Sequence, residues 1–192
     1  MYKIFGFYKF KKIKNIKLLK KNLKNFIEEE QVRGAIIISI EGINGTISFK
    51  PTKYKKVKNK ILNLLNIRKL DNENISYYKY QAFRKGKIKI KKEVVPIGMK
   101  LYKIVTKNKI EPKDWNKFIL KKETVLIDTR KNFEFKVGTF KGSINPELNN
   151  FRDFPRYFKT LKKNQNIGMF CTGGIRCEKA IACLLYTSDA SD

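Results

Sequence analysis

Six segments in the first eighty residues alternate between the hydrophobic period of a strand and that of a helix, which restricts the folds open to the chain. β-Branched and aromatic residues dominate the strand-like segments, and apolar residues recur every three or four positions in the helix-like ones. The order strand, helix, strand, strand, helix, strand is that of a ferredoxin-like fold, in which two helices cover one face of a four-stranded antiparallel sheet. We therefore predict an α+β ferredoxin-like domain over residues 1–97. Its expected elements are 2–10, 13–30, 33–40, 46–49, 51–65 and 75–80.

A short stretch between two of these strands carries two glycines. The segment Glu41-Gly-Ile-Asn-Gly45 lies where the chain must reverse, and glycine and asparagine tolerate the backbone conformations of turns. We therefore expect Glu41, Gly42 and Gly45 to belong to the turn.

Lysine alternates with isoleucine beyond the sixth segment. Lys87, Lys89 and Lys91 occupy every second position, with Ile88 and Ile90 between them. A strand with this pattern presents one basic face and one apolar face. It fits an edge strand whose lysines discourage pairing with another sheet, and equally a ribbon that follows the phosphates of RNA. The three lysines are therefore candidate RNA contacts.

Three tyrosines near the end of the first domain also admit two interpretations. Tyr77, Tyr78 and Tyr80 could stack on bases, as aromatic side chains do on RNA-binding sheets. Alternatively, alternate members of the group belong to the core of the sheet.

The net charge of +27 comes from 44 Lys and Arg against 17 Asp and Glu. Lys, Ile and Asn are all abundant, a bias that an AT-rich coding sequence also produces, so the charge alone does not assign a function. Its distribution is more informative, because residues 1–96 carry +18 and residues 97–192 carry +9. A basic field attracts polyanions such as nucleic acid, and the first half is the expected binding part.

The absence of histidine excludes several kinds of active site. Neither a Ser-His-Asp triad nor a Cys-His pair can operate, and we expect no metal site. Three cysteines in a Lys-rich chain favour a reducing compartment over a disulfide scaffold. No apolar run approaches the ~20 residues of a membrane span, and the basic start lacks the pattern of a signal peptide. We therefore expect a cytoplasmic protein without a membrane partner. The sequence carries no signal for the oligomeric state.

Strands and helices alternate one by one after Pro112, which is typical of a parallel α/β sheet. Segments 124–127 and 166–170 have the composition of buried strands. We predict a linker at 98–110 and an α/β domain at 111–185.

The strongest chemical signal is Cys171, which follows the strand at 166–170 and precedes a helix expected at 177–185. Backbone N–H groups and the positive end of the helix dipole surround a thiol in such a glycine-rich loop, and both favour an anionic sulfur. Gly173 and Gly174 let the loop curl so that its amides point inward, and Arg176 can hold the anion. We expect Cys171 to be the catalytic residue. The supporting loop residues are Thr172, Gly173, Gly174, Ile175 and Arg176.

Four residues separate Cys171 from Arg176, one fewer than in the phosphate cradle of protein tyrosine phosphatases. The tighter loop suits a sulfur atom carried on the cysteine and matches the rhodanese pattern. The segments DTR at 128–130 and GTFKGS at 138–143 also resemble the rhodanese framework, with Thr139 where many members have histidine.

Further segments extend the resemblance from about residue 2 to residue 185. Together they resemble the rhodanese-domain, oxygen-dependent tRNA uridine hydroxylase family, which installs 5-hydroxyuridine at the wobble position of tRNA. The segments are EGINGT at 41–46, KKEVV at 91–95, GTFKGSINP at 138–146, FRDFP at 151–155 and MFCTGGIRCEKA at 169–180.

The resemblance implies that Cys171 acts through a persulfide intermediate, with tRNA as partner, dioxygen as co-substrate and no cofactor evident. It also implies a rhodanese-like domain that continues with a further strand and helix beyond residue 185. We therefore expect the parallel sheet to be incomplete at its C-terminal end. Residues 186–192 have no apolar period, and we expect them to be a non-native tail.

Two other functions remain open at this stage. One is a sulfurtransferase that moves sulfane sulfur from thiosulfate, and the other is a non-catalytic RNA-binding module with a vestigial thiol.

Cys177 could resolve an oxidised Cys171 or simply pack in the core, and Cys183 is expected to pack there. Asp128 and Arg130 are expected to fix loops by ion pairing rather than to act as base and acid.

Overall fold

The computed structural model describes residues 1–99, 109–162 and 165–189. These residues form two compact units, which divide between Val94 and Val95. Residues 100–108, most of the predicted linker, lie outside the described residues, so the extent of that linker stays a prediction.

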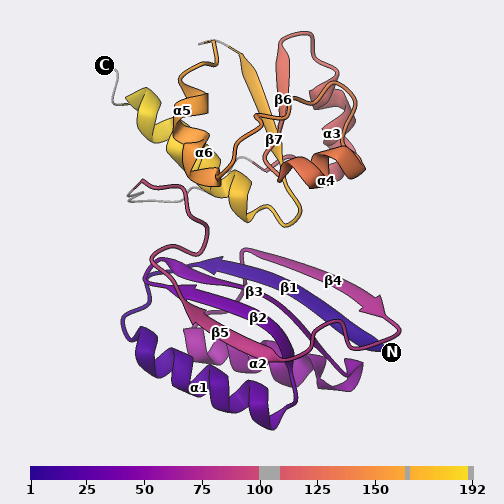
Figure 1. Cartoon of the computed structure of the whole chain (residues 1–192), viewed down its shortest axis with the longest axis vertical. Coiled ribbons are helices and arrows are strands. Elements are labelled where there is room, and N and C mark those ends of the chain that lie inside the picture. The colour runs from indigo at the N-terminus through magenta and orange to yellow at the C-terminus, as the bar shows by residue number, and fades with distance from the viewer. Residues whose placement is uncertain (100–108, 163–164, 190–192) are drawn as a thin grey trace. The chain divides into compact units, whose positions relative to one another are not determined.

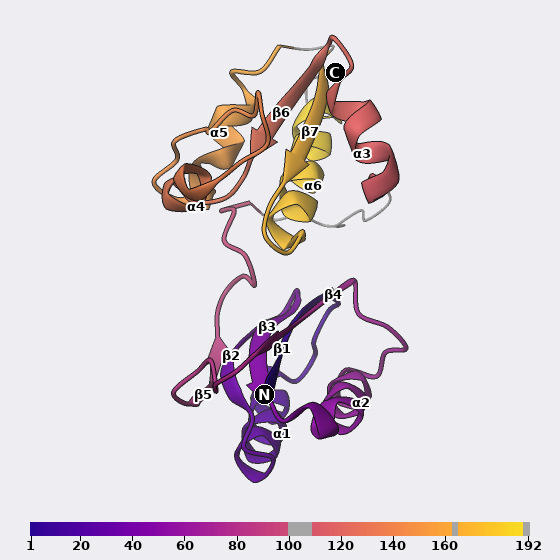
Figure 2. The same cartoon turned by 90° about the vertical axis from the view of Figure 1, so that its right-hand side faces the viewer.

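The first unit is a five-stranded sheet with two helices on one face (Figures 1 and 2). Its strand order is β4-β1-β3-β2-β5, with all neighbours antiparallel except β2 and β5. The first four strands and the two helices have the predicted ferredoxin-like arrangement, which is confirmed. The elements are β1 (Tyr2–Phe10), α1 (Ile16–Glu29), β2 (Arg33–Ser39), β3 (Gly42–Phe49), the 3-10 turn η1 (Pro51–Lys53), α2 (Tyr54–Leu65), β4 (Asn72–Tyr78) and β5 (Gly86–Ile90).

The two helices bury their apolar stripes against the sheet. The side chain of Asn15 caps α1 by accepting a hydrogen bond from the backbone N–H of Leu18 at 3.0 Å. Pro51 begins the turn that leads into α2, where its fixed φ and missing N–H do no harm. The core they share with the sheet includes Phe5, Phe7, Leu19, Leu23, Phe26, Ile36, Ile47, Val57 and Ile61.

The prediction that Gly45 lies in a turn is wrong. The chain reverses at Ile40 and Glu41, and Gly45 lies within β3. A Cβ atom on Gly45 would come within 2.7 Å of the Phe7 ring, so a larger residue would displace a core side chain. Gly42, the first residue of β3, has φ +154, and a Cβ there would lie 2.2 Å from the carbonyl oxygen of Lys9. The two glycines therefore permit close packing of strands as well as the reversal.

The lysine-rich segment forms an edge strand. In the parallel pairing of β2 with β5, Ile88 lies opposite Ile36 and packs against the core, and Lys87 lies opposite Ala35. Lys87, Lys89 and Lys91 are all exposed, as predicted for the basic face, but of the two isoleucines only Ile88 is half-buried, and Ile90 is 43% exposed.

The three tyrosines at the end of β4 and just after it are on the surface. Tyr77, Tyr78 and Tyr80 are 52%, 54% and 62% exposed, which excludes the interpretation that they belong to the core. The ammonium of Lys3 lies over the Tyr77 ring at 5.1 Å from its centroid. Tyr78 is the register partner of Tyr2 in β1.

The second unit has two parallel strands with helices on both sides (Figure 1). One helix, α3, lies on one face of the strand pair, and α5 and α6 lie on the other (Figure 2). The predicted parallel α/β class is confirmed. Within the described residues, no helix has the length and apolar composition needed to cross a bilayer. The elements are α3 (Pro112–Ile119), β6 (Thr124–Asp128), α4 (Asn132–Val137), the 3-10 turn η2 (Phe151–Asp153), α5 (Phe154–Phe158), β7 (Asn166–Phe170) and α6 (Ile175–Asp189).

The last helix is longer than predicted at both ends. It begins at Ile175 rather than at residue 177, and it continues to Asp189 rather than stopping at 185. Residues 186–189 of the predicted tail are therefore helical, whereas residues 190–192 lie outside the described residues.

The segment from Val95 to Met99 packs with the second unit. Ile97 is fully buried in its core together with Ile127, Phe154, Phe158, Ala180 and Cys183. The ammonium of Lys179, also fully buried, donates a hydrogen bond to the Val95 carbonyl at 2.7 Å. A buried lysine is tolerated only where its ammonium is hydrogen-bonded, so this contact fixes the segment against α6.

Candidate active site

Two loops meet at the carboxyl ends of the parallel strands. Cys171 directly follows β7. Asp128 is the last residue of β6, and Thr129 and Arg130 follow it. Since parallel strands place their carboxyl ends at the same edge, the two loops lie together. The hydroxyl and the amide of Thr129 both donate to the carbonyl of Phe170, at 3.0 and 3.1 Å. This edge is therefore held by hydrogen bonds one residue away from the thiol.

The loop around Cys171 stabilises a thiolate. The N–H of Gly174 donates to Sγ of Cys171 at 3.0 Å, and Gly174 has φ +82, a conformation that favours glycine. The pKa of Cys171 is lowered from 9.0 to about 5, chiefly by a hydrogen bond from the thiol of Cys177. Burial raises this pKa, but the amides of Cys177 and Gly173 and the charge of Arg176 lower it further. Cys171 is therefore predominantly ionised at neutral pH.

Cys177 is the hydrogen-bond donor to this thiolate. Its side chain is buried, and its Sγ lies 3.6 Å from the hydroxyl oxygen of Thr129. The hydrogen bond to Cys171 and burial raise the pKa of Cys177 well above its ordinary value. The Cys177 thiol thus keeps its proton and donates a hydrogen bond to Cys171, a role that the sequence alone did not indicate.

Arg176 is held at the side of the loop by three neighbours. Its guanidinium donates to the carbonyl of Thr129 and to the hydroxyl of Thr172, both at 3.3 Å, and lies 3.5 Å from the carboxylate of Glu134. Thr172 in turn donates to Glu134 at 2.7 Å. Arg176 therefore acts on Cys171 through its charge, from a position fixed by these contacts.

Glu134 in α4 is a site residue that sequence reasoning missed. Burial raises the pKa of Glu134, but the hydrogen bond from Thr172, the Lys131 amide and the charge of Arg176 outweigh it and lower the pKa. A single glutamate in a short helix carries no motif, so only the proximity of the loops identifies it.

Asp128 and Arg130 form the predicted ion pair. The guanidinium of Arg130 donates to the buried carboxylate of Asp128 at 2.7 Å and to the carbonyl of Gly138 at 2.6 Å. Thr139, at the position where many rhodaneses have histidine, donates to the same carboxylate at 3.0 Å. Burial raises the pKa of Asp128, but these hydrogen bonds outweigh it and leave the pKa below its ordinary value. The pair ties the loop after α4 to the end of β6.

The remaining cysteine and the candidate RNA contacts lie elsewhere. Cys183 is fully buried, lies 3.3 Å from the sulfur of Met99, and has its pKa raised to about 11 by burial. Ile175, the first residue of α6, is buried beside the loop. Lys87, Lys89 and Lys91 belong to the first unit and are not part of the loop around Cys171. Among the residues with described positions, no group of three or more Cys, Asp and Glu side chains is arranged to hold a metal ion.

Comparison with known domain families assigns both units. Residues 2–94 match the family described as UPF0176 acylphosphatase like domain, and residues 111–189 match the family described as Rhodanese-like domain. The order of the two domains agrees with the order predicted from the motifs.

Individual relatives match nearly the whole chain. A protein of Pelagibacter ubique named tRNA uridine(34) hydroxylase is 53% identical over 181 residues, which are 94% of this chain and 60% of that protein. Proteins of the same name from Wolbachia sp. subsp. Brugia malayi and from Acinetobacter baumannii are each 37% identical. They cover 92% and 93% of this chain, which in turn spans 66% and 57% of their lengths. The predicted resemblance is confirmed, and the chain spans about 60% of the length of these curated relatives.

Proposed function

We propose that this chain, a relative of the proteins named tRNA uridine(34) hydroxylase, is the part of such an enzyme that binds tRNA and supplies its reactive cysteine. The reaction is the oxygen-dependent conversion of the wobble uridine to 5-hydroxyuridine. The observation that carries the proposal is a thiolate-stabilising loop at Cys171 in a chain 53% identical to a protein of that name. A tRNA substrate also favours a cytoplasmic location.

The loop is suited to carry a sulfur atom on Cys171. A thiolate attacks the outer sulfur of a donor such as thiosulfate, a new Sγ–S bond forms, the donor's S–S bond breaks, and sulfite leaves. The terminal sulfur of the resulting persulfide is anionic, as the thiolate is. The N–H groups of Gly173, Gly174 and Cys177 and the charge of Arg176 favour an anion at this position.

Dioxygen is the proposed co-substrate. Insertion of one oxygen atom into the C5–H bond of uridine consumes two electrons and two protons, and the second oxygen atom leaves as water. We propose a thiol reductant as the source of these electrons, oxidised to its disulfide. Cys171 and its loop then serve as the reactive sulfur centre of the enzyme.

The test measures 5-hydroxyuridine in tRNA. A strain that lacks the hydroxylase is complemented with the full-length protein that contains this chain, and tRNA nucleosides are quantified by mass spectrometry. We expect the wild type to restore the nucleoside, Cys171→Ser to leave it absent, and the matched core variant Cys183→Ala to restore it. Active wild-type protein that leaves 5-hydroxyuridine unchanged would refute the proposal.

A sulfurtransferase is the second candidate, because the four-residue spacing from Cys171 to Arg176 matches the rhodanese pattern. It predicts transfer of sulfur from thiosulfate to cyanide at a rate that does not depend on tRNA, with no change in tRNA nucleosides. The third candidate, a non-catalytic RNA-binding module, predicts that Cys171→Ser retains function. The complementation and a thiosulfate assay together separate the three.

A further inference from the structure

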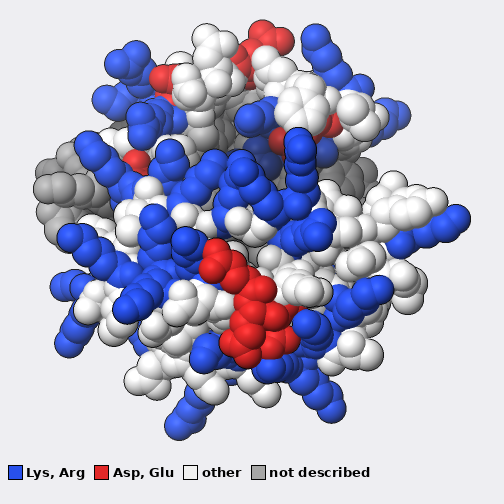
Figure 3. Space-filling view, turned by 60° about the horizontal axis from the view of Figure 1, so that its bottom comes forward, with Lys and Arg blue, Asp and Glu red and all other residues white. Residues whose placement is uncertain are grey.

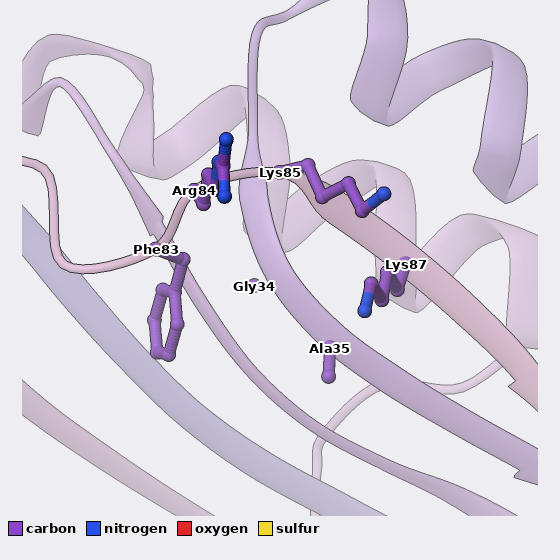
Figure 4. A pocket seen from close by; sticks show the side chains of 6 residues that line it. All are labelled: Gly34, Ala35, Phe83, Arg84, Lys85 and Lys87. Carbon is purple, nitrogen blue, oxygen red and sulfur yellow. The ribbon is translucent and has the colours of Figure 1, made fainter.

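A hollow of about 590 Å³ lies where β2, β5 and the segment before β5 meet. This volume is within the range of about 300–1,000 Å³ typical of small-ligand sites. The helices α1 and α2 lie behind the strands in the close view of Figure 4, so the hollow opens on the face of the sheet that they leave uncovered. Its lining residues are Gly34, Ala35, Phe83, Arg84, Lys85 and Lys87.

The lining combines one aromatic ring with three cations and has no acidic residue. Figure 4 shows the Phe83 ring on one side of β2 and the Lys85 and Lys87 side chains on the other, with Ala35 between them. A flat ring offers a surface on which a base can stack, and guanidinium and ammonium groups pair with phosphate. The hollow therefore presents the two kinds of contact that a nucleotide requires.

Backbone hydrogen bonds hold the walls in place. The N–H of Gly34 donates to the carbonyl of Lys85 at 3.1 Å, and Lys87 is the register partner of Ala35 in the parallel strand pair. At the other end of the segment, the side-chain amide of Gln81 donates to the carbonyl of Ser48 in β3 at 3.4 Å. The segment from Gln81 to Lys85 is thus tied to the sheet at two points, and Phe83 lies between them.

Charge alone does not select this face. Figure 3 shows Lys and Arg side chains spread over the side of the first unit where α1 and α2 lie, and exposed lysines there include Lys21, Lys24 and Lys55. Those lysines belong to a generally basic surface, whereas the cations around Phe83 border a hollow with an aromatic wall. The combination distinguishes a nucleotide site from the overall charge.

We propose that this hollow binds one unpaired nucleotide of the tRNA substrate, with its base on Phe83 and its phosphate at Lys85 and Lys87. The proposal rests on the function proposed above and deepens it, because it names the surface that receives single-stranded RNA. Lys89 and Lys91 continue the basic edge of β5 beyond the hollow and follow the neighbouring phosphates. A base-paired strand cannot stack its bases on Phe83, so the site selects a loop over a duplex.

The test compares binding of two RNA probes to the full chain by fluorescence anisotropy. The probes are a hairpin with a uridine-containing loop and a duplex of the same length. We expect Phe83→Ala to weaken hairpin binding about 10-fold, as loss of one stacked base does, and to leave duplex binding unchanged. Phe83→Tyr, which keeps the ring, restores hairpin affinity. Lys87→Ala makes the negative slope of log K against log salt shallower by about 0.7, the value for one phosphate contact of a single strand.

Lys55→Ala is the matched control, because Lys55 is an exposed lysine of α2 that lies outside the hollow. We expect its effect on hairpin affinity to be smaller than that of Lys87→Ala. If the wild type prefers the hairpin but Phe83→Ala binds both probes as the wild type does, the nucleotide site is overturned and the proposed hydroxylase function stands. If the wild type binds neither probe and the complementation restores no 5-hydroxyuridine, both are overturned.

Discussion

The hydrogen bond from Cys177 to Cys171 gives the sharpest prediction about the reactive loop. Cys177→Ala removes the donor that contributes most to the lowered pKa of Cys171, whereas Cys177→Ser keeps an O–H donor at the same position. The burial of Cys171, which raises its pKa, is retained in both variants. The Ala variant is therefore expected to have a less acidic Cys171 than the Ser variant.

The expected size of the change follows from the energy of such a bond. A hydrogen bond to a charged group contributes about 1.5–3 kcal/mol, and about 1.4 kcal/mol corresponds to one pH unit. The pKa of Cys171 should then rise from about 5 in the wild type to about 6–7 in Cys177→Ala. Since the thiolate forms above the pKa, about 90% of Cys171 is ionised at pH 6 in the wild type, against about half or less in the variant.

The assay is the rate of alkylation by iodoacetamide between pH 4 and pH 9, with the modified peptide identified by mass spectrometry so that only Cys171 is counted. We expect a midpoint near pH 5 for the wild type and for Cys177→Ser, and a higher midpoint for Cys177→Ala. In the control Cys183→Ala, which replaces a cysteine of the core, the Cys171 thiol should titrate as it does in the wild type. Equal midpoints for the wild type and Cys177→Ala would refute the reasoning.

Four further substitutions test the packing and the loop geometry. Gly174→Ala places a Cβ on a residue with φ +82 and should destabilise the loop by about 1–2 kcal/mol. Gly173→Ala, with nothing within 4 Å of its Cβ, should be tolerated. We expect the alkylation rate of Cys171 to fall in Gly174→Ala and to stay at the wild-type value in Gly173→Ala. Asp128→Asn breaks a buried ion pair with Arg130. It should lower the free energy of unfolding of the second unit by about 3 kcal/mol, which urea unfolding measures. Phe5→Ala, at a fully buried core position, should lower the free energy of unfolding of the first unit by about 3–5 kcal/mol. An unchanged unfolding midpoint would contradict the packing described.

The sequence predicted the features that depend on periodicity. Apolar spacing identified the two helices and four strands of the first unit, because burial of one face imposes the same period on sequence and structure. The alternation of lysine with isoleucine predicted a strand over β5 for the same reason, and the strand order then placed it at the edge of the sheet. Gly45 was misassigned because a glycine that makes room for the Phe7 ring looks the same in sequence as a glycine in a turn.

The parts of the sites that escaped prediction are contacts between distant segments. The motif at Cys171 indicated a stabilised anion, but the donor role of Cys177 depends on the pitch of α6 and on the position of Thr129. Glu134 reaches the loop only because β6 and β7 end at the same edge. Phe83 lies between β4 and β5, where the sequence has neither the hydrophobic period of a helix nor that of a strand. Only the folded sheet shows that it borders a hollow.

The buried Lys179 determines where an independently folding second unit has to begin. The rhodanese-like match starts at residue 111, but a fragment cut there would lose the Val95 carbonyl that accepts from the Lys179 ammonium. It would also lack Ile97, which is fully buried, and removal of such a side chain costs about 2–5 kcal/mol. The boundary of a family match and the boundary of a stable fold therefore differ by about sixteen residues in this chain. A fragment that retains Val95 keeps α6, and with it the base of the loop that carries Cys171, in its native packing.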